Sequence, residues 1–438
     1  MELSEKKTRF ILFGILLLSI VLHTWRLPIP SRAVFDEAHY ATYAGNYRTH
    51  TPFFDIHPPL GKFIYSIPLY AYPEKYSSDA HYIEFINKGI IVEYNEKNRV
   101  FSNFPYIPLR TMSGFFGTLL VLSIFLFIKE LTKNNIIALF SAFFITLENA
   151  LLIETRFIFL DGIFLTFSFF ALWQFLKQKD SGIYSGILWG CALATKLVGI
   201  IFLPFVLFQK IDWWKKWKFI TVGFFTLGIL WVGIQWYSFP TAQWYEFTKS
   251  INNDFAETIP KISNKLLPTE NLALKTYLLL SELSWSTPGY TTLKGHNQSE
   301  SKWYEWPFMI GSFCYSEPAF PFCLIGNPAL WGFGFFSIIW TLFYMIIKKL
   351  REQKVDTIIT TLLFGYFSTL LPFAIIPRYA LIWQYFSSLI FSLCLAAYWI
   401  VTYTNTLEKK YRIASYAILI FIVCVGFLVV SPTTFGIR

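Results

Sequence analysis

The chain has 438 residues, of which 55% are hydrophobic, 20% aromatic and only 15% charged. Charged residues make up about a quarter of an ordinary soluble domain, so this composition excludes a soluble globular protein. The formal net charge of +10 does not indicate a nucleic-acid partner, because the basic residues lie at the ends of apolar runs and not among exposed aromatic residues.

Long apolar runs recur along the chain and predict an all-α integral membrane protein. A helix of about 18 apolar residues crosses a hydrocarbon core about 30 Å thick. The alternating pattern of a membrane β-barrel is absent from the sequence, and helices and closed barrels are the structures that satisfy backbone polar groups in lipid. We expect eleven spans, at about 10–25, 109–127, 136–153, 157–176, 182–195, 197–208, 219–237, 328–347, 357–376, 381–402 and 413–430.

The first apolar run, from Phe10 to about Trp25, follows basic residues and resembles a signal peptide as well as a span. No small-residue cleavage site follows it, and the chain continues as Arg26-Leu-Pro-Ile-Pro30. We therefore expect a retained span.

Positive charges predict the orientation of the chain. With the N-terminus in the cytosol, Lys and Arg are concentrated in short cytosolic connections, and only Arg156, Lys196 and Arg378 lie near the short outer turns. Two long polar segments then lie on the non-cytosolic side. We expect one polytopic membrane domain, residues 1–438, with a first outer segment at 26–108 that holds the candidate catalytic loop, a second at 238–327, and a C-terminal four-helix part at 328–438.

Charged side chains that border the expected spans cluster at the outer face, and charges at a membrane are costly enough to be functional candidates. The adjacent acids Asp36 and Glu37 come directly after the first span. An ionised carboxylate within hydrogen-bonding reach takes the proton from a hydroxyl nucleophile, so the pair is a candidate general base. The alternative is a solvated loop pair in which Asp36 caps a helix.

The next candidate is the segment Phe53-Phe-Asp-Ile-His-Pro-Pro-Leu-Gly-Lys62. Its consecutive prolines restrict the backbone, and Gly61 permits close approach. A rigid turn of this kind could hold Asp55, His57 and Lys62 against a substrate. The alternative is an ordinary helix start with Lys62 extending towards lipid headgroups.

Arg156 lies between two expected spans with almost no loop around it. A planar guanidinium suits a phosphate diester because it donates charge-assisted, often bidentate hydrogen bonds. The alternatives are contact with lipid headgroups and a structural pair with Asp161, and we expect that pair. Lys196 and Arg378 are candidates for contacts with an anionic ligand or with lipid headgroups.

Two cysteines, Cys314 and Cys323, lie nine positions apart in the second outer segment, and an oxidising compartment would allow them to be bridged. No spacing of His, Cys and acidic residues resembles a zinc site, so no metal site is expected. The sequence also has no internal repeat with paired broken helices, which would favour a transporter.

Several motifs follow one another from near the N-terminus to the tenth expected span. They are Phe35-Asp-Glu-Ala-His-Tyr40, Phe54-Asp-Ile-His-Pro-Pro-Leu-Gly-Lys62, Arg156-Phe-Ile-Phe-Leu-Asp161, Ala194-Thr-Lys-Leu-Val-Gly199, Trp303-Tyr-Glu-Trp-Pro307, Ile325-Gly-Asn-Pro328 and Pro377-Arg-Tyr-Ala-Leu-Ile-Trp-Gln-Tyr385. In content and order they resemble the protein O-mannosyltransferases, which are dolichyl- or polyprenyl-phosphate-mannose-dependent enzymes of the GT-C membrane class.

The resemblance implies a GT-C type bundle that transfers mannose, with inversion, from a polyprenyl-phosphate-mannose donor to Ser or Thr of secreted or membrane proteins. No nucleotide sugar or nucleic acid takes part. The implied roles are a base for Asp36, positioning of acceptor or donor for Glu37, phosphate binding for Arg156, and further donor contacts for Lys196, Arg378, Asp55, His57 and Lys62.

The second outer segment is too short for the β-trefoil module of the eukaryotic members. The resemblance therefore implies a prokaryotic-type member in a bacterial cell membrane, with its active site on the periplasmic or extracellular side. One alternative is a GT-C transferase that moves a lipid-linked sugar onto lipid A or another glycan, although His57 and the motif at 303–307 favour a protein acceptor. A transporter or flippase is the second alternative, and it would need ionisable groups near the middle of the bilayer.

Overall fold

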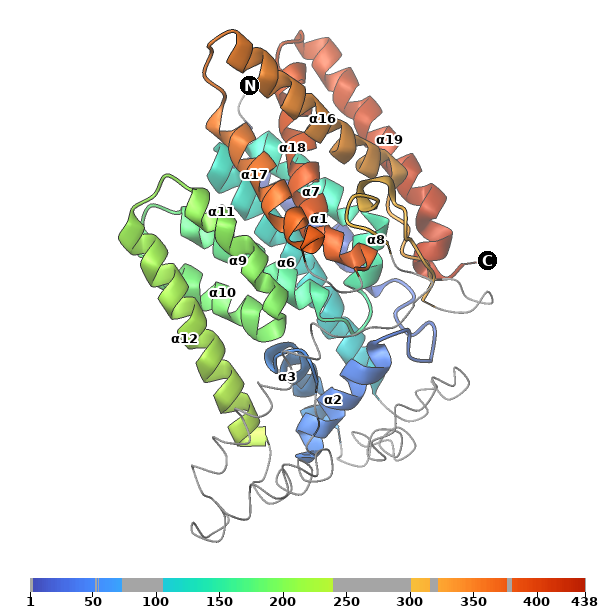
Figure 1. Ribbon diagram of the computed structural model, residues 1–438. Helices are drawn as coiled ribbons and strands as arrows, with labels where there is room; N and C mark the ends of the chain where they lie inside the picture. The colour runs from blue at the N-terminus through green and yellow to red at the C-terminus, as the bar shows by residue number, and fades with distance from the viewer. Residues whose placement is uncertain are drawn as a thin grey trace.

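The computed structural model of the chain describes residues 3–51, 53, 55–72, 105–238, 301–315, 322–375 and 380–437. Within these ranges the chain is helical, apart from loops and an isolated antiparallel bridge between Cys314 and Cys323, and the expected all-α fold is confirmed (Figure 1). The α-helices are α1 (Glu5–Thr24), α2 (Glu37–Thr49), α3 (Leu60–Ser66), α6 (Tyr106–Thr132), α7 (Asn135–Thr146), α8 (Asn149–Glu154), α9 (Asp161–Leu176), α10 (Ile183–Thr195), α11 (Leu203–Phe208), α12 (Trp213–Ser238), α16 (Pro328–Leu350), α17 (Thr357–Leu370), α18 (Phe386–Thr404) and α19 (Lys409–Phe435). The 3₁₀ helices are η1 (Ile67–Ala71), η3 (Leu197–Phe202), η4 (Trp306–Phe308), η5 (Leu371–Ala374) and η6 (Ile382–Tyr385).

Each of the eleven expected spans coincides with a helical segment. In the described part of the chain, seven segments are long and apolar enough to cross a bilayer: α1, α6, α12, α16, α17 with η5, η6 with α18, and α19. The others, α7, α9, α10 and η3 with α11, are shorter apolar helices. The chain is an integral membrane protein, and eleven crossings stay a prediction.

The expected span at 136–153 differs most from the structure, because it is divided into α7 and α8. Glu148 lies at the break, fully buried, and its carboxylate accepts a hydrogen bond from the backbone N–H of Leu151 at 2.6 Å. The same carboxylate accepts the backbone N–H of Asn327 at 3.0 Å and the indole N–H of Trp331 at 2.8 Å. The break therefore ties α8 to the start of α16, which lies far away in the sequence.

The helices pack as one bundle in which helices from distant parts of the sequence lie next to each other (Figure 1). Helix α6 packs on α7 and α9, α10 packs on α9 and α12, and α18 lies against α7, α16 and α17. Small residues allow a close approach between α10 and α12, where a Cβ on Gly190 would lie 2.6 Å from the carbonyl oxygen of Gly223. This packing fixes the helix ends that carry the polar side chains.

Side chains assigned to the cytosol by the charge distribution gather around one cavity of about 770 Å³. They come from the start of α1 and the ends of α6, α9 and α18, and they include Glu5, Lys129, Lys133, Lys177 and Asn405. These helix ends therefore lie together, away from the outer-face candidates, and their orientation relative to the cytosol stays a prediction.

Candidate active site

Asp36 precedes α2 at its N-cap position, but its side chain makes no capping hydrogen bond. The residue is half-buried, and within the described part of the chain its carboxylate accepts no hydrogen bond. It faces a cavity of about 240 Å³ instead. The capping alternative for the Asp36 side chain is therefore wrong, and the carboxylate is available to a ligand.

Polar side chains from five parts of the chain line this cavity, which we call the outer cavity. Of the expected site residues, it receives Asp36, His57 and Lys196. Aromatic and aliphatic side chains form the rest of its wall, including Phe35 and Trp383. The other polar side chains in the lining are Tyr40, Glu154, Asp161, Gln384 and Ser387.

Lys196 lies at the C-terminal end of α10, where it brings a cation into the outer cavity. Its ammonium donates a hydrogen bond to Oδ2 of Asp161 at 2.6 Å, and both side chains are nearly buried. The expected pairing of Asp161 with Arg156 is therefore wrong. The chain turns between α8 and α9, so Asp161 faces α10 while Arg156 extends towards the end of α19.

Arg156 does not line the outer cavity. Its guanidinium donates hydrogen bonds to the carbonyl oxygens of Thr434, at 3.1 Å, and Trp25, and its central carbon lies 4.6 Å from the ring centroid of Phe435. These contacts tie the end of α1 to the end of α19. Its expected role in phosphate binding stays a prediction.

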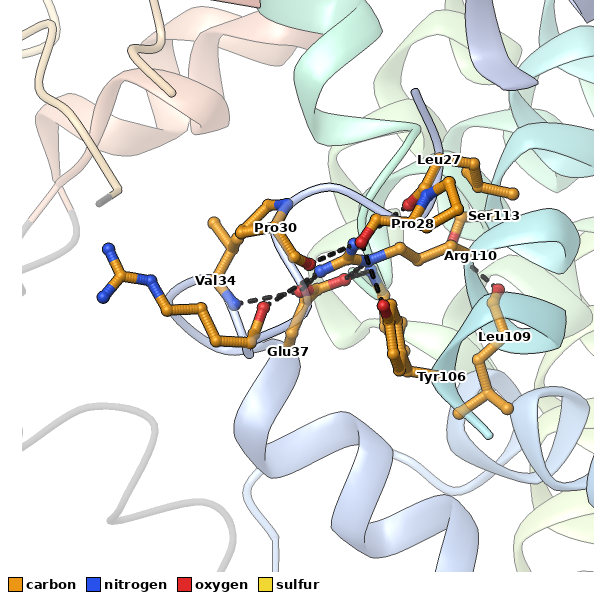
Figure 2. Close-up of polar contacts among 11 residues, drawn as sticks. Leu27, Pro28, Pro30, Val34, Glu37, Tyr106, Leu109, Arg110 and Ser113 are labelled. Carbon is orange, nitrogen blue, oxygen red and sulfur yellow. Dashed lines mark hydrogen bonds and ion pairs between the residues drawn. The ribbon is translucent and has the colours of Figure 1, made fainter. Parts of the chain in front are cut away.

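Glu37 also lies outside the cavity lining, in a fully buried ion pair with Arg110 (Figure 2). Nε of Arg110 donates to Oε1 of Glu37 at 2.8 Å, and a terminal nitrogen donates to Oε2 at 2.7 Å. The same carboxylate accepts the backbone N–H groups of Val34 at 2.9 Å and Ile158 at 3.0 Å. Glu37 thus fixes the backbone next to Asp36, and its expected contact with acceptor or donor stays a prediction.

Arg110 is a residue that the sequence interpretation missed. Besides Glu37, it donates to the carbonyl oxygens of Leu27, Pro30 and Arg32, so it holds the whole loop between α1 and α2 (Figure 2). The available signal was a charged residue at the start of an apolar run, which is costly unless it is paired.

The segment that contains Asp55, His57 and Lys62 is stabilised by hydrogen bonds among these three residues. The buried Lys62 ammonium donates to Oδ2 of Asp55 and to the carbonyl oxygen of His57, each at 2.6 Å. Burial alone would raise the pKa of Asp55, but Lys62 and His57 together hold it below its ordinary value. The expected rigid turn is present, and it presents His57 to the outer cavity.

Glu154 and Tyr315 belong to the same region, and the sequence interpretation assigned neither of them a role in the site. The Tyr315 hydroxyl donates to Oε2 of Glu154 at 2.6 Å, and its ring stacks on Phe35 with centroids 5.1 Å apart. A disulfide joins Cys314 to Cys323 beside it, so the possible bridge is formed. Arg378, the remaining expected donor contact, lies outside the described residues.

Comparison with known families gives two matches that together cover most of the chain. Residues 14–249 match the family model described as dolichyl-phosphate-mannose-protein mannosyltransferase. Residues 274–438 match the model of the C-terminal four TMM region of protein-O-mannosyltransferase.

Curated relatives carry the same family name. Dolichyl-phosphate-mannose–protein mannosyltransferase 4 of Candida albicans is 26% identical over 279 residues, which are 57% of this chain and 33% of the relative. Its Schizosaccharomyces pombe counterpart is 28% identical over 232 residues, which are 50% of this chain and 28% of the relative. The matched part of this chain thus spans about a third of the length of these relatives.

Solved structures show that the fold is of the GT-C type. The Saccharomyces cerevisiae protein O-mannosyltransferase Pmt1-Pmt2 complex bound to the sugar donor matches with a TM-score of 0.73 at 13% identity, over 99% of this chain and 90% of that one. ArnT from Cupriavidus metallidurans in the apo state matches with a TM-score of 0.53 at 14% identity, over 96% of this chain and 64% of that one. At these identities the likeness is one of fold alone. Because the first family model covers more than half of the residues, this chain belongs to the dolichyl-phosphate-mannose-protein mannosyltransferase family.

Proposed function

We propose that this chain transfers mannose from a polyprenyl- or dolichyl-phosphate-mannose donor to Ser or Thr hydroxyls of proteins, on the non-cytosolic side of the membrane. The observation that carries the proposal is the Asp36 carboxylate, which faces the same cavity as Lys196 and makes no capping hydrogen bond. Family membership and the printed names of the relatives support the choice of sugar and carrier.

In the proposed reaction, Asp36 accepts the proton of the acceptor hydroxyl while the hydroxyl oxygen attacks the anomeric carbon of mannose. The bond between that carbon and the phosphate oxygen breaks, and the polyprenyl phosphate leaves with the electron pair. One displacement inverts the anomeric configuration, so one base and a stabilised leaving group are sufficient.

Lys196 is the cation that we assign to the leaving phosphate, because it lines the outer cavity whereas Arg156 does not. An ammonium next to a phosphate oxygen forms a charge-assisted hydrogen bond that strengthens as negative charge develops. Arg156 remains a secondary candidate for the phosphate, and His57 a contact for the sugar.

The size of the outer cavity favours a small transferred group. Its volume of about 240 Å³ lies below the roughly 300–1,000 Å³ of pockets that enclose drug-sized ligands. A single sugar ring suits such a space better than an oligosaccharide does. This agrees with a monosaccharide donor.

An acceptor panel tests the proposal. Purified protein in detergent receives labelled polyprenyl-phosphate-mannose together with a Ser/Thr peptide, lipid A or a free glycan. We expect label on the peptide, with the anomeric configuration opposite to that of the donor. Label on lipid A or the glycan alone would favour the alternative GT-C transferase. After reconstitution of the protein into vesicles, donor movement across the bilayer without transfer would favour a flippase.

We further propose that the protein is of the prokaryotic type and resides in a bacterial cell membrane, with the outer cavity facing the periplasm or the cell exterior. The basic cytosolic connections support this orientation. The disulfide between Cys314 and Cys323 supports an oxidising compartment on the outer side.

A further inference from the structure

Four polar side chains, Tyr315, Glu154, Asp161 and Lys196, interact in series, and the last three line the outer cavity. The Tyr315 hydroxyl donates to Oε2 of Glu154 at 2.6 Å, and the carboxyl groups of Glu154 and Asp161 interact within the lining of the outer cavity. Asp161 in turn accepts the Lys196 ammonium at 2.6 Å. These residues come from the second outer segment, the end of α8, the start of α9 and the end of α10. This series of interactions therefore connects the second outer segment to the Lys196 ammonium.

The contact between the two carboxyl groups requires a proton. Two ionised carboxylates in contact repel each other, whereas one shared proton turns the contact into a hydrogen bond. Burial, with Asp161 beside it, raises the pKa of Glu154 well above its ordinary value. Asp161 faces Lys196, so the shared proton belongs to Glu154.

We propose that Glu154 is a positioning residue that acts in its protonated form, holding the Asp161–Lys196 pair in place for the anionic group of the donor. The inference rests on the proposed function. In this arrangement the protonated Glu154 carboxyl donates to the Asp161 carboxylate, Lys196 donates to Oδ2 of Asp161, and Tyr315 donates to Oε2 of Glu154. The three residues Glu154, Asp161 and Lys196 together then carry no net charge.

Ionisation of Glu154 would have two consequences for the donor. It would add a negative charge to a cavity that must accept a phosphate diester, and it would break the contact that orients Asp161. The titratable groups around Glu154 are Asp161 on α9, Lys196 beyond α10, Tyr315 in the second outer segment and, in the same cavity, Asp36. Donor affinity should therefore fall as the pH rises through the titration of Glu154.

The test measures the donor KM as a function of pH for the parent, Glu154→Gln and Glu154→Leu, at saturating peptide. Gln keeps an uncharged donor of nearly the same shape, whereas Leu removes both hydrogen bonds. We expect the donor KM of E154L to exceed that of E154Q by about tenfold, roughly the net contribution of the hydrogen bond to Asp161, which orients the Asp161–Lys196 pair. The parent should show a rise in donor KM at alkaline pH, and E154Q should lack that rise.

Tyr315→Phe provides a second variant that leaves Glu154 in place. The Tyr315 hydroxyl stabilises the ionised form of Glu154, so its removal raises the pKa of Glu154 further. The alkaline rise in donor KM should then move to higher pH. Thermal unfolding of each variant identifies loss of folding.

Equal donor KM values for E154Q and E154L, or an unchanged alkaline rise in E154Q, would overturn the inference. A shift of that rise to lower pH in Y315F would do the same. These outcomes in an active parent leave the proposed function intact, whereas a parent that transfers no mannose at neutral pH contradicts the proposed function itself.

Discussion

The Asp36 carboxylate is enclosed by apolar and charged neighbours, and burial raises its pKa above the ordinary value, although His39 and Lys196 oppose the shift. A general base must be ionised in order to accept a proton. Transfer should therefore decrease as the pH falls through this raised pKa, above the value of about 3.9 for a free aspartate. The dependence of kcat/KM on pH measures this decrease. A value of kcat/KM that stays constant down to about pH 4 would exclude Asp36 as the base.

The pair of Glu37 and Arg110 is the most enclosed ion pair among the described residues, with both side chains fully buried. Loss of one partner leaves an uncompensated buried charge, which typically costs about 3–5 kcal/mol. Glu37→Gln should lower the free energy of unfolding by an amount of this order and should also reduce transfer, because the loop that carries Asp36 loses its anchor. Denaturant unfolding in detergent, combined with a transfer assay, measures both effects.

A matched control for that experiment is the exposed pair of Lys133 and Glu130. Lys133→Ala removes an ion pair of similar chemistry where solvent screens the charges, so its stability should change little. If Glu37→Gln changed stability no more than Lys133→Ala does, the anchoring role of Glu37 would be wrong.

At the scale of elements, the disulfide between Cys314 and Cys323 holds the segment that carries Tyr315. The backbone N–H of Tyr315 donates to Phe322 at 2.8 Å, and that of Cys323 donates to Thr433 on α19 at 3.2 Å. Closing a loop of this length stabilises a fold by about 2–3 kcal/mol. Replacing both cysteines by Ser should lower stability by that order and weaken donor binding through Tyr315. Unfolding with and without reductant provides the measurement, and a parent insensitive to reductant would contradict it.

The helical elements were predictable because hydropathy is a local property, and every expected span found a helical segment. The division between α7 and α8 was not predictable. It depends on Glu148 meeting Asn327 and Trp331, which lie 179 and 183 positions away in the sequence. Hydropathy carries no information about such distant partners.

For the site, the shared location of the candidate residues was predictable, whereas their ion partners were not. The orientation rule placed Asp36, His57 and Lys196 on one side of the membrane, and the structure brings them to one cavity. The ion partners were not predictable, since the pairs of Glu37 with Arg110 and of Asp161 with Lys196 join residues 73 and 35 positions apart. Charge type and spacing identify such residues as candidates, and tertiary packing selects the partner.

For the whole molecule, we predict that the outer cavity and the basic helix ends lie on opposite sides of the membrane. Lys133 follows α6 and lines the cavity of about 770 Å³, and Tyr304 is exposed in the second outer segment. A membrane-impermeant thiol reagent should label Tyr304→Cys in intact cells and Lys133→Cys only after permeabilisation. The reverse pattern would invert the orientation.

The measurement that tests the central claim most directly is the rate of mannose transfer to a Ser/Thr peptide by Asp36→Asn. A positioned general base contributes about 100-fold or more to the rate, and Asn keeps the shape of the side chain without its basicity. We expect kcat to fall by at least about 100-fold while thermal stability stays close to that of the parent, and Asp212→Asn, on the side that we predict to be cytosolic, should behave as the parent does. Transfer by Asp36→Asn at the parent rate would contradict the account.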